Sequence, residues 1–506
     1  MFENQPKGLW ALALANTGER FGYYTMLAVF LLYLQANFGF ETGTASTIYS
    51  TFLMMVYFLP IIGGIAADKF GFGKMVTTGI FIMFIGYLVL SLPLGKDTVA
   101  IAAMGLSLIL IALGTGLFKG NLQVMVGRLY DEPQFASNRD SGFSLFYMAI
   151  NIGAMFAPTA AIKIMDWAQA NLHVSVEDSY HFAFAVACAS LILSIAIYYA
   201  FGFTYKHVLA RETKKKDADD NKAEIDELSP AETKERIICL CLVFAVVIFF
   251  WMAFHQNGSA LTFFAKKYTD LTVSGTMRIG FNIFSLALIA ISVYTGFATF
   301  QSKSTRSRAI CGVATVLLLS GAYALYAVMD NPTYAQPSDF QQFNPFFVVA
   351  LTPFSMAFFG ALANKGKEVS APTRIAWGML VAALGFGVIT MASTDLISPM
   401  SLGDKTQSIL SPGWLISTYF TLTLAELLLS PMGISFVSKV APPKYKGLMM
   451  GGWFVATAIG NYLSSIPSML WNRIPLMYNW GILIALCLVS ALVMFALLKK
   501  LKEMTA

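Results

Sequence analysis

The chain has 506 residues, of which 57% are hydrophobic and only 12% are charged, whereas a soluble domain has about 25% charged residues. This composition excludes an ordinary soluble protein and favours one that lies in lipid. The formal net charge of +6 does not indicate a nucleic-acid partner, because most Lys and Arg residues lie in short loops between apolar stretches, as the positive-inside rule describes.

The first part of the chain contains six apolar stretches long enough to cross a bilayer, which takes about 20 residues. We predict transmembrane helices there at about 9–35, 45–67, 75–94, 98–125, 140–163 and 180–205. They form an N-terminal six-helix bundle over residues 1–205. Residues 206–236 are too highly charged to enter lipid, so they predict a cytoplasmic linker.

Eight more apolar stretches follow the linker, at about 237–265, 279–300, 309–329, 343–364, 374–394, 412–438, 447–471 and 478–498. The C-terminal bundle, residues 237–506, therefore has two helices more than the first, an extra pair at about 279–329. The total is about 14 transmembrane helices. Both termini are expected in the cytoplasm, since that orientation leaves most of the positive charge inside.

The segment Gly63–Lys74 has the sequence GGIAADKFGFGK and is expected to be the cytoplasmic loop between the second and third helices. It resembles the signature loop of the major facilitator superfamily. The resemblance implies an all-α membrane protein with the major facilitator fold, two six-helix bundles with a substrate site between them, plus the extra helix pair. An ordinary Gly-rich turn is the alternative for this motif alone.

Ionisable residues inside apolar helices cost about 2.5–3.5 kcal/mol on insertion scales, so each one is a candidate functional residue. The first helix carries Asn16, Glu19, Arg20, Tyr23 and Tyr24 on one side, and further polar residues are Lys119, Glu426 and Ser430. A purely structural alternative is that Glu19 pairs with Arg20, or Glu426 with Lys119, only to hold helices together.

Several motifs together resemble the proton-dependent oligopeptide transporter family. The sequence NTGERFGYY at 16–24 is similar to the family's first-helix signature, and GTGLFKGN at 114–121, FYMAINIG at 146–153 and FWMAFHQ at 250–256 follow in the family's order. The segments FNP at 343–345, ELLLSPMGISFVSKVAP at 426–442 and MMGGWF at 449–454 complete the match. Because the motifs span nearly the whole chain, the resemblance is more specific than any one motif.

The resemblance implies a central peptide site with positive and negative ends. Arg20, Lys119 and Tyr24 match positions that hold the peptide carboxylate, and Glu426, Asn151 and Asn344 match positions that hold its amino terminus. Those residue types suit the task, because cations clamp carboxylates and carboxylate or amide oxygens accept from an ammonium. The expected walls of the side-chain pockets are Tyr23, Tyr57, Trp251, Trp453 and Ser430, although for each aromatic residue ordinary helix packing is the alternative.

Proton coupling and gating are expected to involve Glu19, Arg20, Lys119, Glu426 and His255. Lys119 and Glu426 match a family pair between the two halves that opens and closes the inner side. The chain departs from the family where Asn16 replaces a glutamate, Leu27 an arginine and His255 an acidic residue. Since Asn16 cannot titrate, these departures leave proton coupling open.

The sequence therefore predicts secondary-active uptake of di- and tripeptides by alternating access, coupled to protons. The alternative is a carrier of the same fold for another small zwitterion or organic anion, without the usual proton coupling. We expect no enzyme, cofactor or metal site, since no GxxxxGK[ST] loop or metal-binding spacing occurs. The expected partners are di- and tripeptides and the lipid bilayer, with no nucleic acid and no obligate protein partner. The expected location is a bacterial inner membrane.

Overall fold

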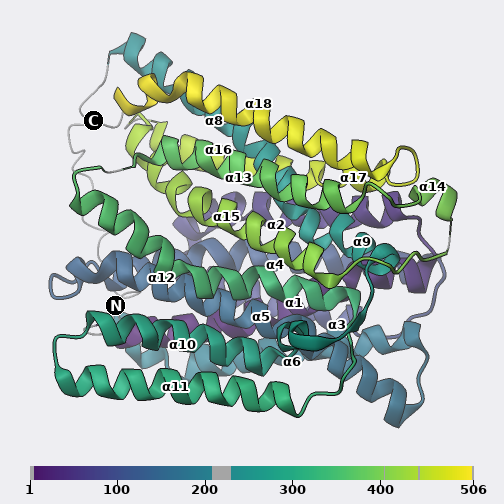
Figure 1. The fold of residues 1–506 in the computed structure, drawn as a ribbon. Helices are drawn as coiled ribbons and strands as arrows, with labels where there is room; N and C mark the ends of the chain where they lie inside the picture. Colours follow the sequence, from purple (N-terminus) through teal and green to yellow (C-terminus); the bar gives the residue numbers. More distant parts are fainter. Residues whose placement is uncertain (1–4, 208–228, 368, 404, 443–444, 504–506) are drawn as a thin grey trace. The chain divides into compact units, whose positions relative to one another are not determined.

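The computed structural model describes residues 5–207, 229–367, 369–403, 405–442 and 445–503, and most of them are helical (Figure 1). A helix satisfies every backbone hydrogen bond within its own segment, which an apolar chain in lipid requires. Contacts divide the chain into two compact units. The first unit is 1–252 with 440–465, and the second is 253–439 with 466–506.

The first unit is built around α1 and α4. Helix α1 packs on α5 and α6, while α4 packs on α2 and α3, and α16 packs on α2. The elements of this unit are α1 (Lys7–Phe38), α2 (Thr42–Phe70), α3 (Phe72–Leu90), α4 (Thr98–Leu129), η1 (Ala136–Asn138), α5 (Arg139–Leu172), α6 (Val176–Ala200), η2 (Gly202–Thr204), α8 (Pro230–Phe254, to residue 252) and α16 (Lys446–Leu463).

The second unit contains the remaining elements. Helix α13 packs on α18, α10 packs on α11 and α12, and the short strands β1 and β2 pair antiparallel. Its elements are η3 (His255–Gly258), α9 (Ala260–Tyr268), β1 (Thr272–Val273), η4 (Gly275–Phe281), α10 (Ile283–Gln301), α11 (Thr305–Ala327), β2 (Thr333–Tyr334), η5 (Pro337–Gln342), α12 (Phe343–Asn364), α13 (Ala371–Ala392), α14 (Pro399–Leu402), α15 (Pro412–Val440), α17 (Ile466–Met469) and α18 (Leu476–Glu503).

A helix covers all or most of every stretch for which the sequence predicted a membrane span. Within the described residues, 12 helical segments are long and apolar enough to cross a membrane. Helices α1 and α16 do not reach that hydropathy, and α1 carries Glu19 and Arg20 in its middle. The count of 14 spans and the cytoplasmic side of both termini stay predictions.

The expected loop at Gly63–Lys74 is mostly helical. Helix α2 continues to Phe70 and α3 begins at Phe72, so Gly71 alone makes the turn. Its φ of 95° is one that a residue with a side chain rarely adopts, and this freedom lets the connection shrink to one residue. The prediction of a longer loop was wrong because only one glycine is needed.

The span expected at 237–265 is divided in two. Helix α8 begins earlier, at Pro230, and ends at Phe254, where His255–Gly258 form a 3-10 turn before α9. The residues of this turn, His, Gln, Asn and Gly, include poor helix formers, which explains the interruption. The predicted linker 206–236 falls largely on residues 208–228, which lie outside the described residues, and the domain boundaries at 205 and 237 stay predictions.

Candidate functional site

The polar stripe of α1 is organised by an ion pair between two successive residues. The Nε and Nη2 atoms of Arg20 donate to the two carboxylate oxygens of Glu19, each at 2.5 Å. Both side chains are buried, with exposed fractions of 3% and 1%. The two charges therefore largely neutralise each other at a depth where an unpaired charge is costly. The pairing of Glu19 with Arg20 that the sequence left as an alternative is present.

Arg20 also connects this pair to the aromatic residues of α1. Its guanidinium carbon lies 4.4 Å from the centre of the Tyr23 ring, and the rings of Tyr23 and Tyr24 meet edge-on at 5.2 Å. The Tyr23 ring reaches α2, where its centre lies 6.1 Å from that of Phe52. An arginine over an aromatic face is held by a cation–π attraction, so the ring fixes the position of the charge.

Lys119 on α4 is the second cation, after Arg20, among the expected site residues. Its Nζ atom lies 4.1 Å from the centre of the Tyr57 ring on α2. Its charge interacts with those of Arg20 and Glu19, so the three charges form one cluster. Within the described residues, Glu19 is the acid of this cluster, and Arg20 occupies both of its oxygens. The cluster therefore carries two cations for one anion, which favours an anionic ligand.

Close backbone contacts of glycines hold α4, which carries Lys119, against α2 and α3. A Cβ atom on Gly63 of α2 would collide with the carbonyl of Gly116 on α4, and one on Gly79 of α3 would collide with Gly114. Beside the first contact, the amide of Asn121 donates to the carbonyl of Gly63 at 3.1 Å. Small residues that let backbones approach are typical of helix contacts in membranes.

Two asparagines of the first unit differ in their hydrogen bonding. Asn16 is 3% exposed, and within the described residues its Nδ2 atom has no hydrogen-bond partner. Asn151 on α5 instead donates to the carbonyl of Tyr147, in the same helix, at 3.0 Å. The Asn151 amide is thus used within α5, whereas the amide of Asn16 keeps its donor capacity.

The expected tryptophans belong to a second group of contacts in the first unit. Trp453 lies on α16 and is buried, and Trp251 lies near the end of α8 and is half-buried. Helices α8 and α16 touch where Gly460 packs against Ile248 and the Cβ atom of Trp251. These residues are therefore tied to the packing of α8 on α16.

In the second unit the acidic residue Glu426 of α15 is held by Asn344 of α12. The Nδ2 atom of Asn344 donates to the Glu426 Oε2 atom at 2.8 Å and to the Thr423 hydroxyl at 3.0 Å. Glu426 is only 8% exposed. Ser430 lies one turn beyond Glu426 on the same face, and within the described residues its hydroxyl has no hydrogen-bond partner. Glu426, Asn344 and Ser430 thus make a polar group suited to a hydrogen-bond donor such as an ammonium.

His255 occupies the 3-10 turn between α8 and α9. Its half-buried ring lies 5.6 Å from that of its neighbour Phe254, while the following residue, Gln256, is fully buried. The structure therefore places His255 at a break in the helix, a position that sequence reasoning did not foresee.

Thr423 is a member of the Glu426 group that the sequence did not reveal. It lies three residues before Glu426, which places both on one face of α15. That spacing could have identified Thr423. A threonine inside an apolar helix usually bonds its own backbone, as Thr423 also does toward the Tyr419 carbonyl.

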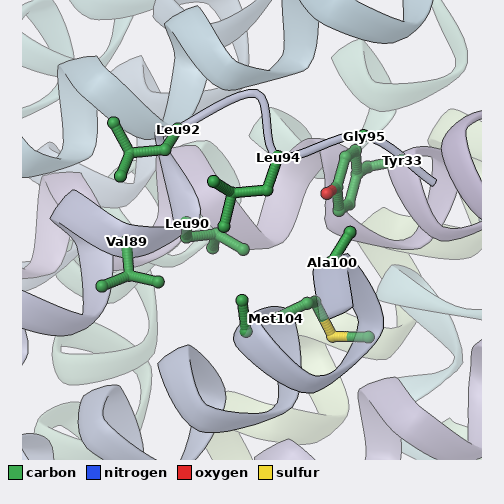
Figure 2. A pocket seen from close by; sticks show the side chains of 9 residues that line it. Tyr33, Val89, Leu90, Leu92, Leu94, Gly95, Ala100 and Met104 are labelled. Carbon is green, nitrogen blue, oxygen red and sulfur yellow. The ribbon is translucent and has the colours of Figure 1, made fainter. Parts of the chain in front are cut away.

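A small pocket in the first unit lies apart from these groups. Figure 2 shows its walls, which come from α1, α3, α4 and the connection between α3 and α4, namely Tyr33, Val89, Leu90, Leu92, Leu94, Gly95, Ala100, Ala103 and Met104. Apart from Tyr33 its lining residues are apolar or glycine, and it includes none of the expected site residues. The pocket therefore adds nothing to the candidate site.

Comparison with known proteins gives a consistent picture. The model of the POT family matches residues 74–216 and 322–483. The chain is 29% identical to the uncharacterized transporter YclF of Bacillus subtilis, over 94% of this chain and 90% of the relative. It is 27% identical to the peptide transporter YePEPT of Yersinia enterocolitica, over 92% and 88%. Its fold is similar to a crystal structure of a peptide transporter POT in complex with sulfate, with a TM-score of 0.73, 23% identity and coverage of 100% and 96%.

Proposed function

Since the chain belongs to the POT family of multi-pass membrane transporters, we propose that it takes up di- and tripeptides by alternating access, in symport with protons. The observation that carries this proposal is the separation of charge between the two units. In the first unit the candidate site residues include a buried cation, Arg20, a half-buried cation, Lys119, and a buried anion, Glu19, and the second unit has the buried carboxylate of Glu426. A zwitterionic peptide has a carboxylate that the cations can bind and an ammonium that the carboxylate of Glu426 can bind.

The cations of the first unit suit the carboxylate end of a peptide. Arg20 already has Glu19 as its partner, so Lys119 supplies the charge that remains to be balanced. A carboxylate beside Lys119 makes a charge-assisted hydrogen bond, which is stronger than a neutral one. Tyr24 lies beside Tyr23 at the same end of the stripe and adds a hydroxyl. We assign Lys119, Arg20 and Tyr24 to the carboxylate.

The polar group of the second unit suits the amino end. Glu426 accepts a hydrogen bond from Asn344, and an ionised carboxylate has about four lone-pair sites, so it can accept from several donors at once. We assign Glu426, Asn344 and Asn151 to the ammonium. The residues Tyr23, Tyr57, Trp251, Trp453 and Ser430 would form walls for side chains, because aromatic faces tolerate many shapes.

Protons enter through the carboxylates. When Glu426 takes up a proton, its attraction for Lys119 is lost, so a proton, like the substrate, can break a pair of these two residues. In this proposal the competition opens and closes a gating pair of Glu426 with Lys119. Glu19 and His255 are the other groups able to exchange protons, and the direction of uptake is into a bacterial cell across its inner membrane.

Uptake by the purified protein in liposomes tests the proposal. A labelled dipeptide is supplied with and without an inward proton gradient, and Glu426→Gln is measured in parallel with the native chain. Accumulation that needs the gradient and is lost in the variant supports proton-coupled peptide transport. If the dipeptide only equilibrates and the gradient has no effect, the chain is a peptide transporter without proton coupling. Absence of any peptide binding would overturn the assignment of substrate.

A second candidate function is favoured by Asn16. This buried residue lies one turn before Glu19 and cannot titrate, so the α1 stripe has one acid rather than two. A carrier of another small zwitterion or organic anion, without proton coupling, would follow if that missing acid is essential. Competition between the labelled dipeptide and a series of non-peptide zwitterions distinguishes the two functions.

A further inference from the structure

Helix α12 contains a proline in its interior. Pro353 has no backbone N–H, and in an α-helix that group would donate to the carbonyl of the residue four positions earlier, Val349. The carbonyl of Val349 thus lacks its intrahelical donor. In lipid an unsatisfied backbone group is costly, and helices with prolines there need a donor from elsewhere.

The donor comes from α10. The hydroxyl of Tyr294 donates to the carbonyl oxygen of Val349 at 3.0 Å. Three residues along α10, the Phe297 ring packs edge-on against Phe354, with ring centres 4.9 Å apart and planes at 84°. The two contacts lie on either side of the proline in the sequence of α12. Figure 1 shows α10 running beside α12.

The proline separates two parts of α12 that differ in packing. Six residues before it are buried, whereas Phe359 is the one buried residue after it within the described part of the helix. Phe354, Met356 and Phe358 are each more than half exposed. The first part carries Asn344, which holds Glu426. A helix hinge at Pro353 would therefore lie between a well-buried part with a candidate site residue and a part that is less buried.

Helix α10 makes several polar contacts with α11, and these contacts hold α10 in place beside α12. The hydroxyls of Thr295 and Thr315 lie 2.8 Å apart, and the Ser285 hydroxyl donates to the Ala322 carbonyl at 3.4 Å. The buried Arg278 of η4, before α10, donates from Nη1 to the carbonyls of Met329 and Asp330, which follow α11, at 2.8 and 3.0 Å. Hydrogen bonds thus join the two helices, and the segments at their ends, at several positions along their length.

We propose that Tyr294 is a positioning residue of the transport cycle, which clamps the Pro353 hinge of α12 and so links the pair α10–α11 to the Asn344–Glu426 group. The family match covers 74–216 and 322–483, so Pro353 and Val349 lie within it, whereas Tyr294 lies in the unmatched stretch 217–321. The role of Tyr294 in transport rests on the proposed function, whereas its hydrogen bond to Val349 does not depend on that function.

A double-mutant cycle tests the clamp. Tyr294→Phe removes the hydroxyl, and Pro353→Ala restores the N–H that Val349 lacks. Hydrogen–deuterium exchange of the purified full chain follows the amides near the hinge, and initial rates and KM of uptake are measured in liposomes. Tyr323→Phe is the matched control, because this tyrosine lies on α11 of the same helix pair and is 67% exposed.

We expect Tyr294→Phe to speed exchange near the hinge by about threefold to tenfold, as for loss of one hydrogen bond. It should change the turnover several-fold with little change in KM. In the Pro353→Ala background the same substitution should have no effect, because Val349 then has its own donor. An equal effect in both backgrounds, or none in either, would overturn the clamp. A shift in exchange without uptake of any peptide by any variant would retain the clamp and reject the proposed function.

Discussion

The side-chain amide of Asn344 lies 2.8 Å from the carboxylate of Glu426 and joins α12 to α15 by a charge-assisted hydrogen bond. The same amide lies 3.0 Å from the Thr423 hydroxyl, so one donor group serves a charged and a neutral acceptor. The two bonds differ in strength, and this difference can be measured.

Asn344→Ala should weaken peptide binding more than Thr423→Val does. The first change removes both bonds, including the one to a charged group, worth about 1.5–3 kcal/mol, and the second removes only the neutral one, worth about 1 kcal/mol. We expect a loss of at least tenfold in dipeptide affinity for Asn344→Ala and a few-fold loss for Thr423→Val. Isothermal titration of a dipeptide measures both, and equal losses would contradict the ranking.

Lys119→Gln should abolish discrimination between a dipeptide and its C-terminal amide. If Lys119 binds the peptide carboxylate, the native chain prefers the free acid by about tenfold or more, since bonds to charged groups are the stronger ones. The variant should bind both forms equally weakly. Lys69→Gln is the control, because Lys69 lies over the Phe70 ring at 5.5 Å but is exposed. A preference that survives in Lys119→Gln would place the carboxylate elsewhere.

Asn16→Glu should increase the dependence of uptake on a proton gradient. The substitution adds a second titratable group one turn before Glu19, on the same face of α1. Asn16→Gln keeps the size of the new side chain without the charge and should behave like the native chain. Uptake at matched membrane potential, with and without a pH difference, measures the change. If both variants respond alike, side-chain size rather than titration is responsible.

Gly63→Ala should destabilise the first unit, whereas Gly64→Ala should not. The new methyl group at Gly63 would collide with the carbonyl of Gly116, while a Cβ atom on Gly64 meets nothing within 4 Å. Overpacking costs about 1–3 kcal/mol, so the thermal midpoint in detergent should fall by several degrees for the first change only. Equal midpoints would show that the two helices separate easily.

The helices were predictable because long apolar stretches leave an α-helix as the only local structure that satisfies the backbone in lipid. The interruptions were not. The turn at His255 falls inside an otherwise apolar stretch, and the reduction of a twelve-residue motif to a turn at Gly71 depends on one backbone angle. Both depend on local backbone conformation, which hydropathy does not measure.

The candidate site was predictable as a set of residue types but not as a set of contacts. The cost of ionisable groups in lipid singled out Glu19, Arg20, Lys119 and Glu426. Which of them pair depends on side-chain conformation, and the bidentate pair of Glu19 with Arg20 arises between successive residues, whose side chains point about 100° apart on a helix. The bond of Tyr294 to Val349 needed knowledge of which helices are neighbours.

The ladder of β1 with β2 pairs Val273 with Thr333 and Thr272 with Tyr334. The chain therefore enters and leaves the pair α10–α11 at adjacent points, since paired residues of antiparallel strands lie about 4.5–5.5 Å apart. A two-residue Asn-Gly turn could join Val273 directly to Thr333 as an ordinary hairpin. The pair α10–α11 is thus a self-contained insertion, and its removal would not require the chain on either side of it to be rerouted.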